Sequence, residues 1–95
     1  MKLPLHKIAE FISATGDYPK EEVAQEYSID SRTVREGELF FAVKGDRFDG
    51  HDFVASALEK GAVAAVVRND HSDRFPDKSR LLFVEDTLPT KDNTN

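Results

Sequence analysis

The sequence contains neither cysteine nor tryptophan. Without cysteine, disulfides, thiolate metal sites and cysteine nucleophiles are all excluded. Long apolar runs are also missing: the longest, residues 62–67, is far below the roughly 20 residues needed to cross a bilayer. The first residues lack the apolar segment of a secretory signal. We therefore expect a cytoplasmic domain with no membrane partner.

Positive charge is scarce, with 13 Lys and Arg against 18 Asp and Glu and a net charge of −5. Nucleic-acid binding needs clustered basic residues that displace counterions, so no nucleic-acid partner is expected. A small phosphorylated ligand stays compatible, since a local backbone nest or one well-placed arginine can hold it. Neither G-x-x-x-x-G-K-[S/T] nor G-x-G-x-x-G occurs, which excludes these two phosphate-binding loops.

What the chain does contain is one domain of 95 residues with 39% hydrophobic residues. Apolar residues at helical spacing are Leu5, Ile8, Ala9 and Ile12. They predict one helix with a single apolar stripe, and Gly16 marks its exit. Residues 17–26 are polar and predict a loop that leads into an edge strand.

Four further segments, residues 27–31, 39–43, 62–67 and 81–84, have the composition of strands. A second helix is expected to begin near His51 and Asp52 and to end at Gly61, a favourable residue just past a helix end. The predicted fold is α/β: a small mixed sheet of about four to five strands with two helices. Residues 39–67 form one βαβ crossover, which should be parallel and right-handed.

The segment Ile29-Asp30-Ser31-Arg32 lies where a strand gives way to a loop. Ser31 and the backbone around it can hydrogen-bond a ligand, and Arg32 offers a planar fork for phosphate or carboxylate. The alternative is a plain turn in which Asp30 pairs with Arg32 or with a backbone N–H. The residues alone leave both readings open.

A second candidate segment runs from Lys44 to His51, between a strand and a helix. Such strand-to-helix loops are where α/β sheets bind ligands, especially anions. Its glycines, Gly45 and Gly50, permit close backbone approach, while Lys44 and Arg47 carry charge and Phe48 offers a stacking face. An ordinary connection with glycines for turn geometry is the alternative.

Metal binding and nucleophilic catalysis find little support in the sequence. Asp49, His51 and Asp52 are near neighbours at a helix start that do not face one point, and no second nearby histidine or cysteine supports them. We therefore predict no metal site. Ser31 as a nucleophile would require a positioned base and an oxyanion hole, and neither can be identified in the sequence.

These motifs occur in a familiar order: D-S-R at residues 30–32, G-E-L-F at 37–40, A-V-K-G at 42–45 and D-G-H-D-F at 49–53. In that order and spacing the chain resembles the N-terminal domain of Mur ligases, and the MurF type more than the MurE type. The resemblance covers about residues 5–88. It implies a Mur-ligase-like domain over residues 1–88, followed by a polar, frayed tail over 89–95.

The resemblance implies that the domain holds a UDP-N-acetylmuramoyl-peptide during peptidoglycan synthesis, on which cell wall biogenesis, cell shape and division depend. Residues implied to contact the UDP moiety are Ile29, Ser31, Arg32, Asp46, Arg47 and Phe48. Supporting residues are Asp30, Gly45, Asp49, Gly50 and His51. No residue of this chain is implied to be catalytic.

In a complete ligase, central and C-terminal domains would be the partners of this one and would supply the sites for ATP and Mg²⁺. This chain shows no such cofactor site, so we expect it to be inactive alone. Three alternatives remain: a MurE-type domain, a structural or interaction module that keeps the fold without ligand binding, and a small independent enzyme. For the small independent enzyme, no catalytic group can be identified in the sequence.

Overall fold

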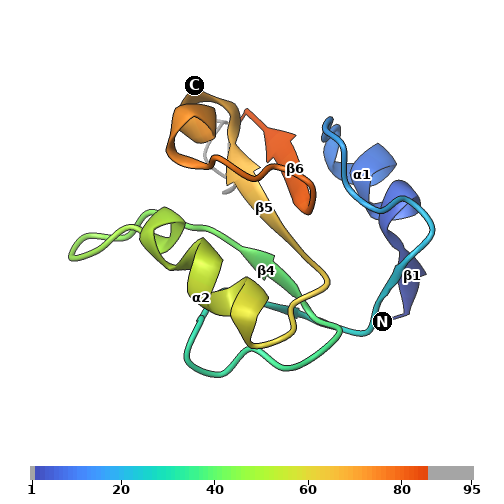
Figure 1. The fold of residues 1–95 in the computed structure, drawn as a ribbon, viewed down its shortest axis with the longest axis horizontal. Helices are drawn as coiled ribbons and strands as arrows, with labels where there is room; N and C mark the ends of the chain where they lie inside the picture. Colours follow the sequence, from blue (N-terminus) through green and yellow to red (C-terminus); the bar gives the residue numbers. More distant parts are fainter. Residues whose placement is uncertain (1, 86–95) are drawn as a thin grey trace.

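A computed structural model of the chain describes residues 2–85 (Figure 1). Its elements, with η for a 3-10 helix, are β1 (Leu3–Pro4), α1 (Leu5–Ile12), β2 (Val23–Ala24), β3 (Tyr27–Ser28), β4 (Leu39–Phe41), η1 (Gly50–Phe53), α2 (Val54–Glu59), β5 (Ala64–Arg68), η2 (Asn69–Arg74) and β6 (Leu81–Val84). The tail predicted at 89–95 and the predicted domain end at residue 88 lie outside the described residues.

The main sheet has four strands in the order β3-β4-β5-β6, and all neighbours in it are parallel. The α/β class and the parallel pairing across the predicted crossover are thereby confirmed. Antiparallel pairing within residues 2–85 occurs where Thr15 bridges Phe83 on β6, where β1 pairs with β2, and where Lys44 bridges Asp49 after β4. The sequence does not indicate β1 or β2, because two-residue strands carry too little periodicity.

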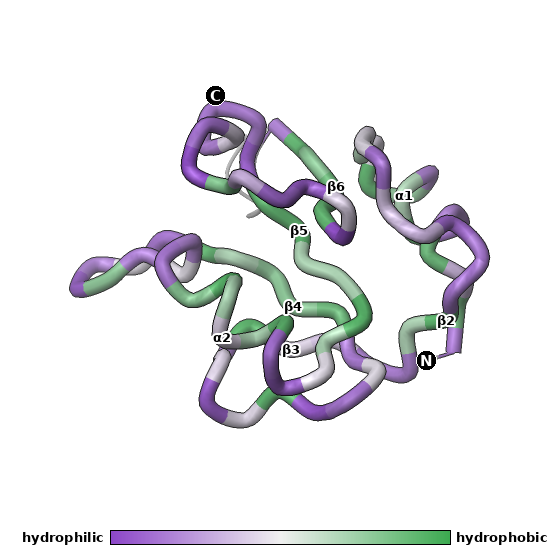
Figure 2. The backbone as a smooth tube through the Cα atoms, viewed as in Figure 1, coloured by the Kyte–Doolittle hydropathy of each residue, from purple (hydrophilic) through white to green (hydrophobic). Residues whose placement is uncertain are grey.

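Side chains that alternate along the strands build two separate cores. One core contains Leu5, Ile8, Leu39, Val66 and Leu82, and it joins α1 to one face of the sheet. The other contains Phe40, Val54, Ala57, Val67 and Leu81, and it joins α2 to the opposite face. Figure 2 shows the same pattern, with hydrophobic colouring along the central strands and hydrophilic colouring on the loops around them. The β4 and β5 strands are apolar throughout because both of their faces are covered.

The first helix confirms the predicted apolar stripe but ends earlier than expected. Ser13 takes a left-handed conformation (φ 58°), and its N–H returns to carbonyls of the last turn. Gly16 instead serves a close approach to β6: a Cβ at this position would stand 2.6 Å from the carbonyl oxygen of Leu81. Its φ of 134° also favours glycine.

The second helix begins as the short η1 and continues as α2, with Gly61 at φ 105° just past its end, as predicted. Residues 69–74, between the third and fourth predicted strands, form η2. The predicted strand 27–31 stops at Ser28. Within residues 2–85, no helix has the length and apolar character to span a membrane.

Candidate functional site

The candidate site lies at the edge of the sheet where the parallel strands end. Residues 29–32 follow β3, residues 42–49 follow β4, and η2 follows β5. Because β3, β4 and β5 are parallel neighbours, these three connections leave the sheet at the same edge. Ligands of open α/β sheets bind at this carboxyl edge. Both segments singled out in the sequence therefore start at the expected place (Figure 1).

In the first segment, Asp30 organises the turn. Its Oδ1 accepts hydrogen bonds from the backbone N of Arg32 at 2.9 Å and from the Arg32 Nε at 3.0 Å, and its Oδ2 accepts from Nη2 at 2.9 Å. These bonds from Arg32 lower the pKa of Asp30 to about 2. The segment thus has the turn structure that was predicted as the alternative to a ligand site. One side of the Arg32 guanidinium is already bound to Asp30.

Other atoms of the same segment remain open to solvent. The Arg32 side chain is 84% exposed, and Ile29 is 63% exposed. The carbonyl oxygen of Ser31 accepts a hydrogen bond from Lys60 Nζ at 2.7 Å, which ties the turn to the end of α2. An exposed apolar side chain beside an exposed guanidinium suits contact with a ligand or another domain.

The second segment folds back on itself after β4. The backbone of Lys44 forms an antiparallel β-bridge with that of Asp49. The Gly45 N–H donates to the Phe48 carbonyl at 2.9 Å, and the Gly50 N–H donates to the Val43 carbonyl at 2.8 Å. A Cβ on Gly50 would stand 2.7 Å from the backbone nitrogen of Val43, so glycine allows this closure. We call residues 44–49 the β4 loop.

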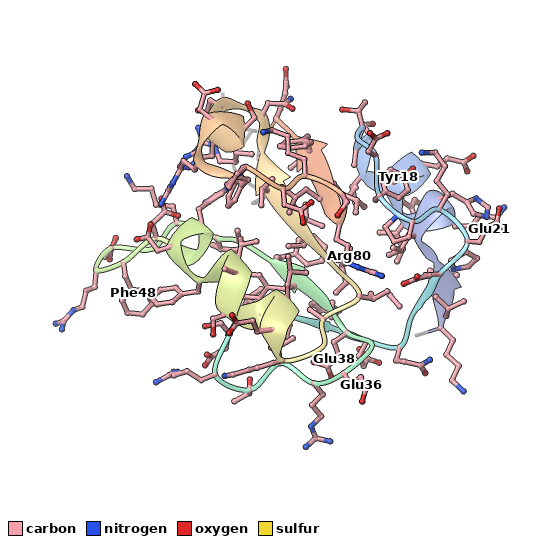
Figure 3. The ribbon with its side chains drawn as sticks, in the orientation of Figure 1. Tyr18, Glu21, Glu36, Glu38, Phe48 and Arg80 are labelled. Atoms are coloured by element: carbon pink, nitrogen blue, oxygen red, sulfur yellow. The ribbon has the colours of Figure 1, made fainter. Side chains whose placement is uncertain are left out.

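Asp46, Arg47 and Phe48 occupy the tip of the β4 loop, and all are exposed. The Phe48 ring is 66% exposed and meets Phe53 edge-on, with centroids 6.0 Å apart. Figure 3 shows Phe48 at the outer end of the molecule, far from the α1 side. The tip therefore presents an aromatic face and a guanidinium to solvent.

The base of the β4 loop is held by His51. The ring is fully buried, with Nδ1 2.7 Å from Asp49 Oδ1. Its Nε2 accepts a hydrogen bond from the backbone N–H of Arg68 at 3.0 Å. Burial lowers the pKa of His51, although the carboxylate of Asp49 acts in the opposite direction. A neutral ring thus connects the loop to the end of β5.

Asp49 has partners from two directions. Burial would raise its pKa, but the backbone and ring hydrogen bonds from His51, with help from Arg74, hold the pKa well below its ordinary value. Arg74 Nη1 lies 3.2 Å from Asp49 Oδ2 and 2.7 Å from His71 Nδ1, and Arg74 Nη2 donates to Asp52. The carboxylate is therefore ionised and fixed.

Sequence reasoning names Asp49 and His51 as supporting residues, which the structure places at the loop base, but it does not name Arg68, His71 or Arg74. These residues come from β5 and η2, 17 to 25 positions further along the chain. No local pattern links them to the loop, because the contacts depend on β4 and β5 lying side by side.

Asp49, His51 and His71 each place one possible metal-ligand atom within 4.8 Å of the others. The two imidazoles are stacked, with centroids 4.0 Å apart and planes inclined by 22°. Imidazole lone pairs lie in the ring plane, so two nearly parallel stacked rings do not converge on one ion. Both ring nitrogens of His51 are also engaged in the loop base. The geometry opposes a metal centre here.

A cavity of about 670 Å³ lies between α2 and residues 74–80. Its lining includes Leu58 and Phe75 but none of the six residues predicted to contact UDP. Its arginines are already paired, Arg74 as described and Arg80 with Glu22 at 2.9 Å. The cavity is therefore no better as an anion site than the open edge, where the predicted contacts lie.

Residues 24–84 match the family described as Mur ligase family, catalytic domain. Over 60 residues the chain is 47% identical to the UDP-N-acetylmuramoyl-L-alanyl-D-glutamate--2,6-diaminopimelate ligase of Aquifex aeolicus, covering 63% of this chain and 12% of that protein. Over 90 residues it is 37% identical to the UDP-N-acetylmuramoyl-tripeptide--D-alanyl-D-alanine ligase of Bacillus subtilis, covering 93% of this chain and 20% of that protein.

Among solved structures, MurF from Acinetobacter baumannii superposes with a TM-score of 0.75 at 26% identity, covering 92% of this chain and 19% of that one. MurF ligase from Thermotoga maritima in complex with ADP gives a TM-score of 0.61 at 39% identity, covering 70% and 15%. The chain thus spans about a fifth or less of the length of these relatives.

Proposed function

The chain belongs to the Mur ligase family and resembles its N-terminal domain, and on that premise we propose that it recognises the substrate of a MurF-type ligase. In this role it anchors the UDP end of UDP-N-acetylmuramoyl-tripeptide. The ligase of Bacillus subtilis, named for this tripeptide, aligns with 93% of the chain, and the MurF of Acinetobacter baumannii superposes on 92% of it.

The observation that carries this proposal is the carboxyl edge of the sheet, where two predicted contact segments leave neighbouring parallel strands. Exposed guanidinium groups at Arg32 and Arg47 suit a diphosphate, because planar forks match phosphate oxygens. Exposed apolar side chains at Ile29 and Phe48 suit the face of a uracil ring. Cations and apolar faces at one edge fit a nucleotide better than a peptide alone.

Anchoring the nucleotide would contribute to ligation by position. A ligase that activates the peptide carboxylate must hold that group in place, and fixing the far end of the substrate restricts its motion. We assign no chemical step to this chain. ATP, Mg²⁺ and the acyl-phosphate chemistry belong to the central and C-terminal domains that a complete ligase would contain, and such an enzyme would act in the cytoplasm.

A MurE-type role is the second candidate, because the diaminopimelate ligase of Aquifex aeolicus is 47% identical over the segment it shares. The UDP end is common to dipeptide and tripeptide precursors, so this domain alone should bind both. Discrimination requires a complete ligase that carries this sequence, assayed with both precursors. Preferential addition of D-alanyl-D-alanine to the tripeptide supports the MurF type, and addition of diaminopimelate to the dipeptide supports the MurE type.

Binding itself is tested by NMR titration of the 95-residue chain with UDP-N-acetylmuramoyl-tripeptide. Amide shifts should concentrate at residues 29–32 and 46–48, and ATP should cause no specific shifts. Losing one charge-assisted hydrogen bond costs about 1.5–3 kcal/mol, so Arg47→Gln should weaken binding by about tenfold or more. The matched control, Arg35→Gln, changes an exposed arginine outside both segments and should leave affinity unchanged. If no amide shifts at millimolar ligand, the result would favour the alternative, a structural or interaction module that does not bind the ligand.

A further inference from the structure

His51 is the only buried polar side chain among residues 2–85, at 2% exposure. Its hydrogen bonds define its protonation state. The backbone N–H of Arg68 can only donate, so Nε2 must accept and carries no proton. The proton of the neutral ring therefore sits on Nδ1, where it donates to Asp49 Oδ1. One tautomer alone satisfies both partners.

This ring joins the base of the β4 loop to the end of β5, beside the Arg74 pairs that join the loop base to η2. Asp49 is the last residue of the β4 loop, and Arg68 is the last residue of β5. The ring is packed between them against His71, stacked at 4.0 Å, and Phe75, at 6.4 Å. Displacing the ring would leave the carboxylate that ends the loop with Arg74 as its side-chain partner and the backbone N–H of Arg68 without its acceptor.

We propose that His51, as a neutral imidazole, is a positioning residue that holds the β4 loop in its ligand-binding conformation. The proposal rests on the proposed function, in which Asp46, Arg47 and Phe48 at the loop tip contact the nucleotide. His51 does not touch the ligand in this scheme. It acts through Asp49, whose carboxylate accepts hydrogen bonds from the His51 ring and backbone N–H, and whose backbone pairs with Lys44 where the loop closes.

A second proton on the ring would break this arrangement. It would place an N–H on Nε2 facing the Arg68 N–H, two donors 3.0 Å apart. The charged and titratable groups around the ring are Asp49 on the loop, Asp52 on η1, Arg68 on β5, and Asp70, His71 and Arg74 on η2. Asp49 favours the charged ring, whereas burial and the charges of His71 and Arg74 oppose it, and the pKa of His51 is lowered.

The first test uses the unmodified chain without ligand. Long-range ¹H–¹⁵N spectra of the imidazoles should show His51 protonated at Nδ1 and unprotonated at Nε2 at neutral pH. As the pH falls, the amides of Arg47 and Phe48 should shift and lose order in step with the His51 titration, while the amide of Ile29 should not. Tip amides that stay unchanged while His51 titrates, or an Nε2-protonated ring at neutral pH, would overturn the proposal.

The second test compares His51→Gln with the matched control His6→Gln on α1, titrating each with UDP-N-acetylmuramoyl-tripeptide. If the loop occupies its binding conformation about a tenth of the time in His51→Gln, apparent affinity falls about tenfold, and the control should bind like the parent. Equal affinity of the two variants would refute positioning. If the parent itself does not bind but its loop still follows the His51 titration, the proposed function fails and the loop-holding role stands. Should His51→Gln not fold, the first test decides alone.

Discussion

The Asp30–Arg32 bonds that shape the turn at residues 29–32 join positions two residues apart, whereas the bonds that tie the base of the β4 loop to β5 and η2 join positions 17 to 25 apart. The first set is exposed, with the Arg32 side chain 84% accessible, and the second surrounds a fully buried imidazole. The Asp30–Arg32 bonds need only the sequence of the turn, and one exposed bond from Lys60 to Ser31 links it to the end of α2. The loop base needs β4, β5 and η2 to be assembled first.

This difference sets what each segment contributes to the fold. Exposed ion pairs contribute little to stability because water competes for both partners. Buried hydrogen bonds contribute modestly when made, and leaving a buried partner unsatisfied is costly. Two segments for which the same role is proposed at one edge should therefore respond very differently to substitution.

The largest effect is expected for His51→Ala, which leaves a cavity, removes the ring partner of Asp49 and removes the acceptor of the Arg68 N–H. The free energy of unfolding should fall by about 2–4 kcal/mol, from the lost packing and the unsatisfied donor. Urea unfolding followed by circular dichroism measures it. A loss below about 1 kcal/mol would show that the loop base is held mainly by other contacts.

A smaller loss is expected for Arg74→Gln, which removes the pairing of a partly exposed guanidinium with Asp49 and Asp52. We expect about 1 kcal/mol, since the pairs form a network but face solvent on one side. Arg47→Gln at the loop tip is the comparison, and it should change stability by less than about 0.5 kcal/mol. Equal effects of the two variants would mean that Arg74 does not support the loop base.

Mild acid should act on the loop base alone. The folded pKa of His51 lies below its ordinary value of 6.5, so the unfolded chain takes up this proton first. The stability that comes from the neutral ring is complete above pH 6.5 and is lost as pH falls toward the folded pKa. Urea midpoints from pH 7.5 to 5 should decline in the parent and decline less in His51→Gln. Identical profiles would contradict the assignment.

The smallest effect is expected for Asp30→Asn in the turn. The pKa of Asp30 is lowered to about 2, so its contribution is complete above pH 4 or so and is lost only as pH falls through about 2. At neutral pH the urea midpoint should stay within experimental error, and amide shifts should be confined to residues near Arg32 and Lys60. Shifts beyond these residues would show that the turn is coupled to more of the fold than the Lys60 bond.

Local patterns were sufficient to predict much of this architecture. The apolar runs at 39–43 and 62–67 predict strands covered on both faces, and the rule for parallel strands then places residues 29–32 and 44–51 at one edge. Gly61 marks the end of α2 because a left-handed residue is needed there. Each of these inferences depends on neighbours in sequence.

Contacts between distant segments were not predictable in the same way. His71 and Arg74 lie in η2, which has no periodic apolar signal, so nothing in the sequence assigns them to Asp49. The burial of His51 was equally unpredictable, since a histidine beside acidic residues at a helix start is usually solvated. The roles of the predicted UDP contacts stay predictions until a ligand is titrated.

The bridge between Thr15 and Phe83 has a consequence for how the chain folds during synthesis. It joins the segment after α1 to the last strand of the sheet, and the core under α1 includes Leu82 and Val84. On the ribosome, α1 emerges before the strands of the main sheet and lacks these partners until β6 has been made. Contacts this distant in sequence form slowly, and an apolar helix that waits for them is open to capture by chaperones or by other nascent chains.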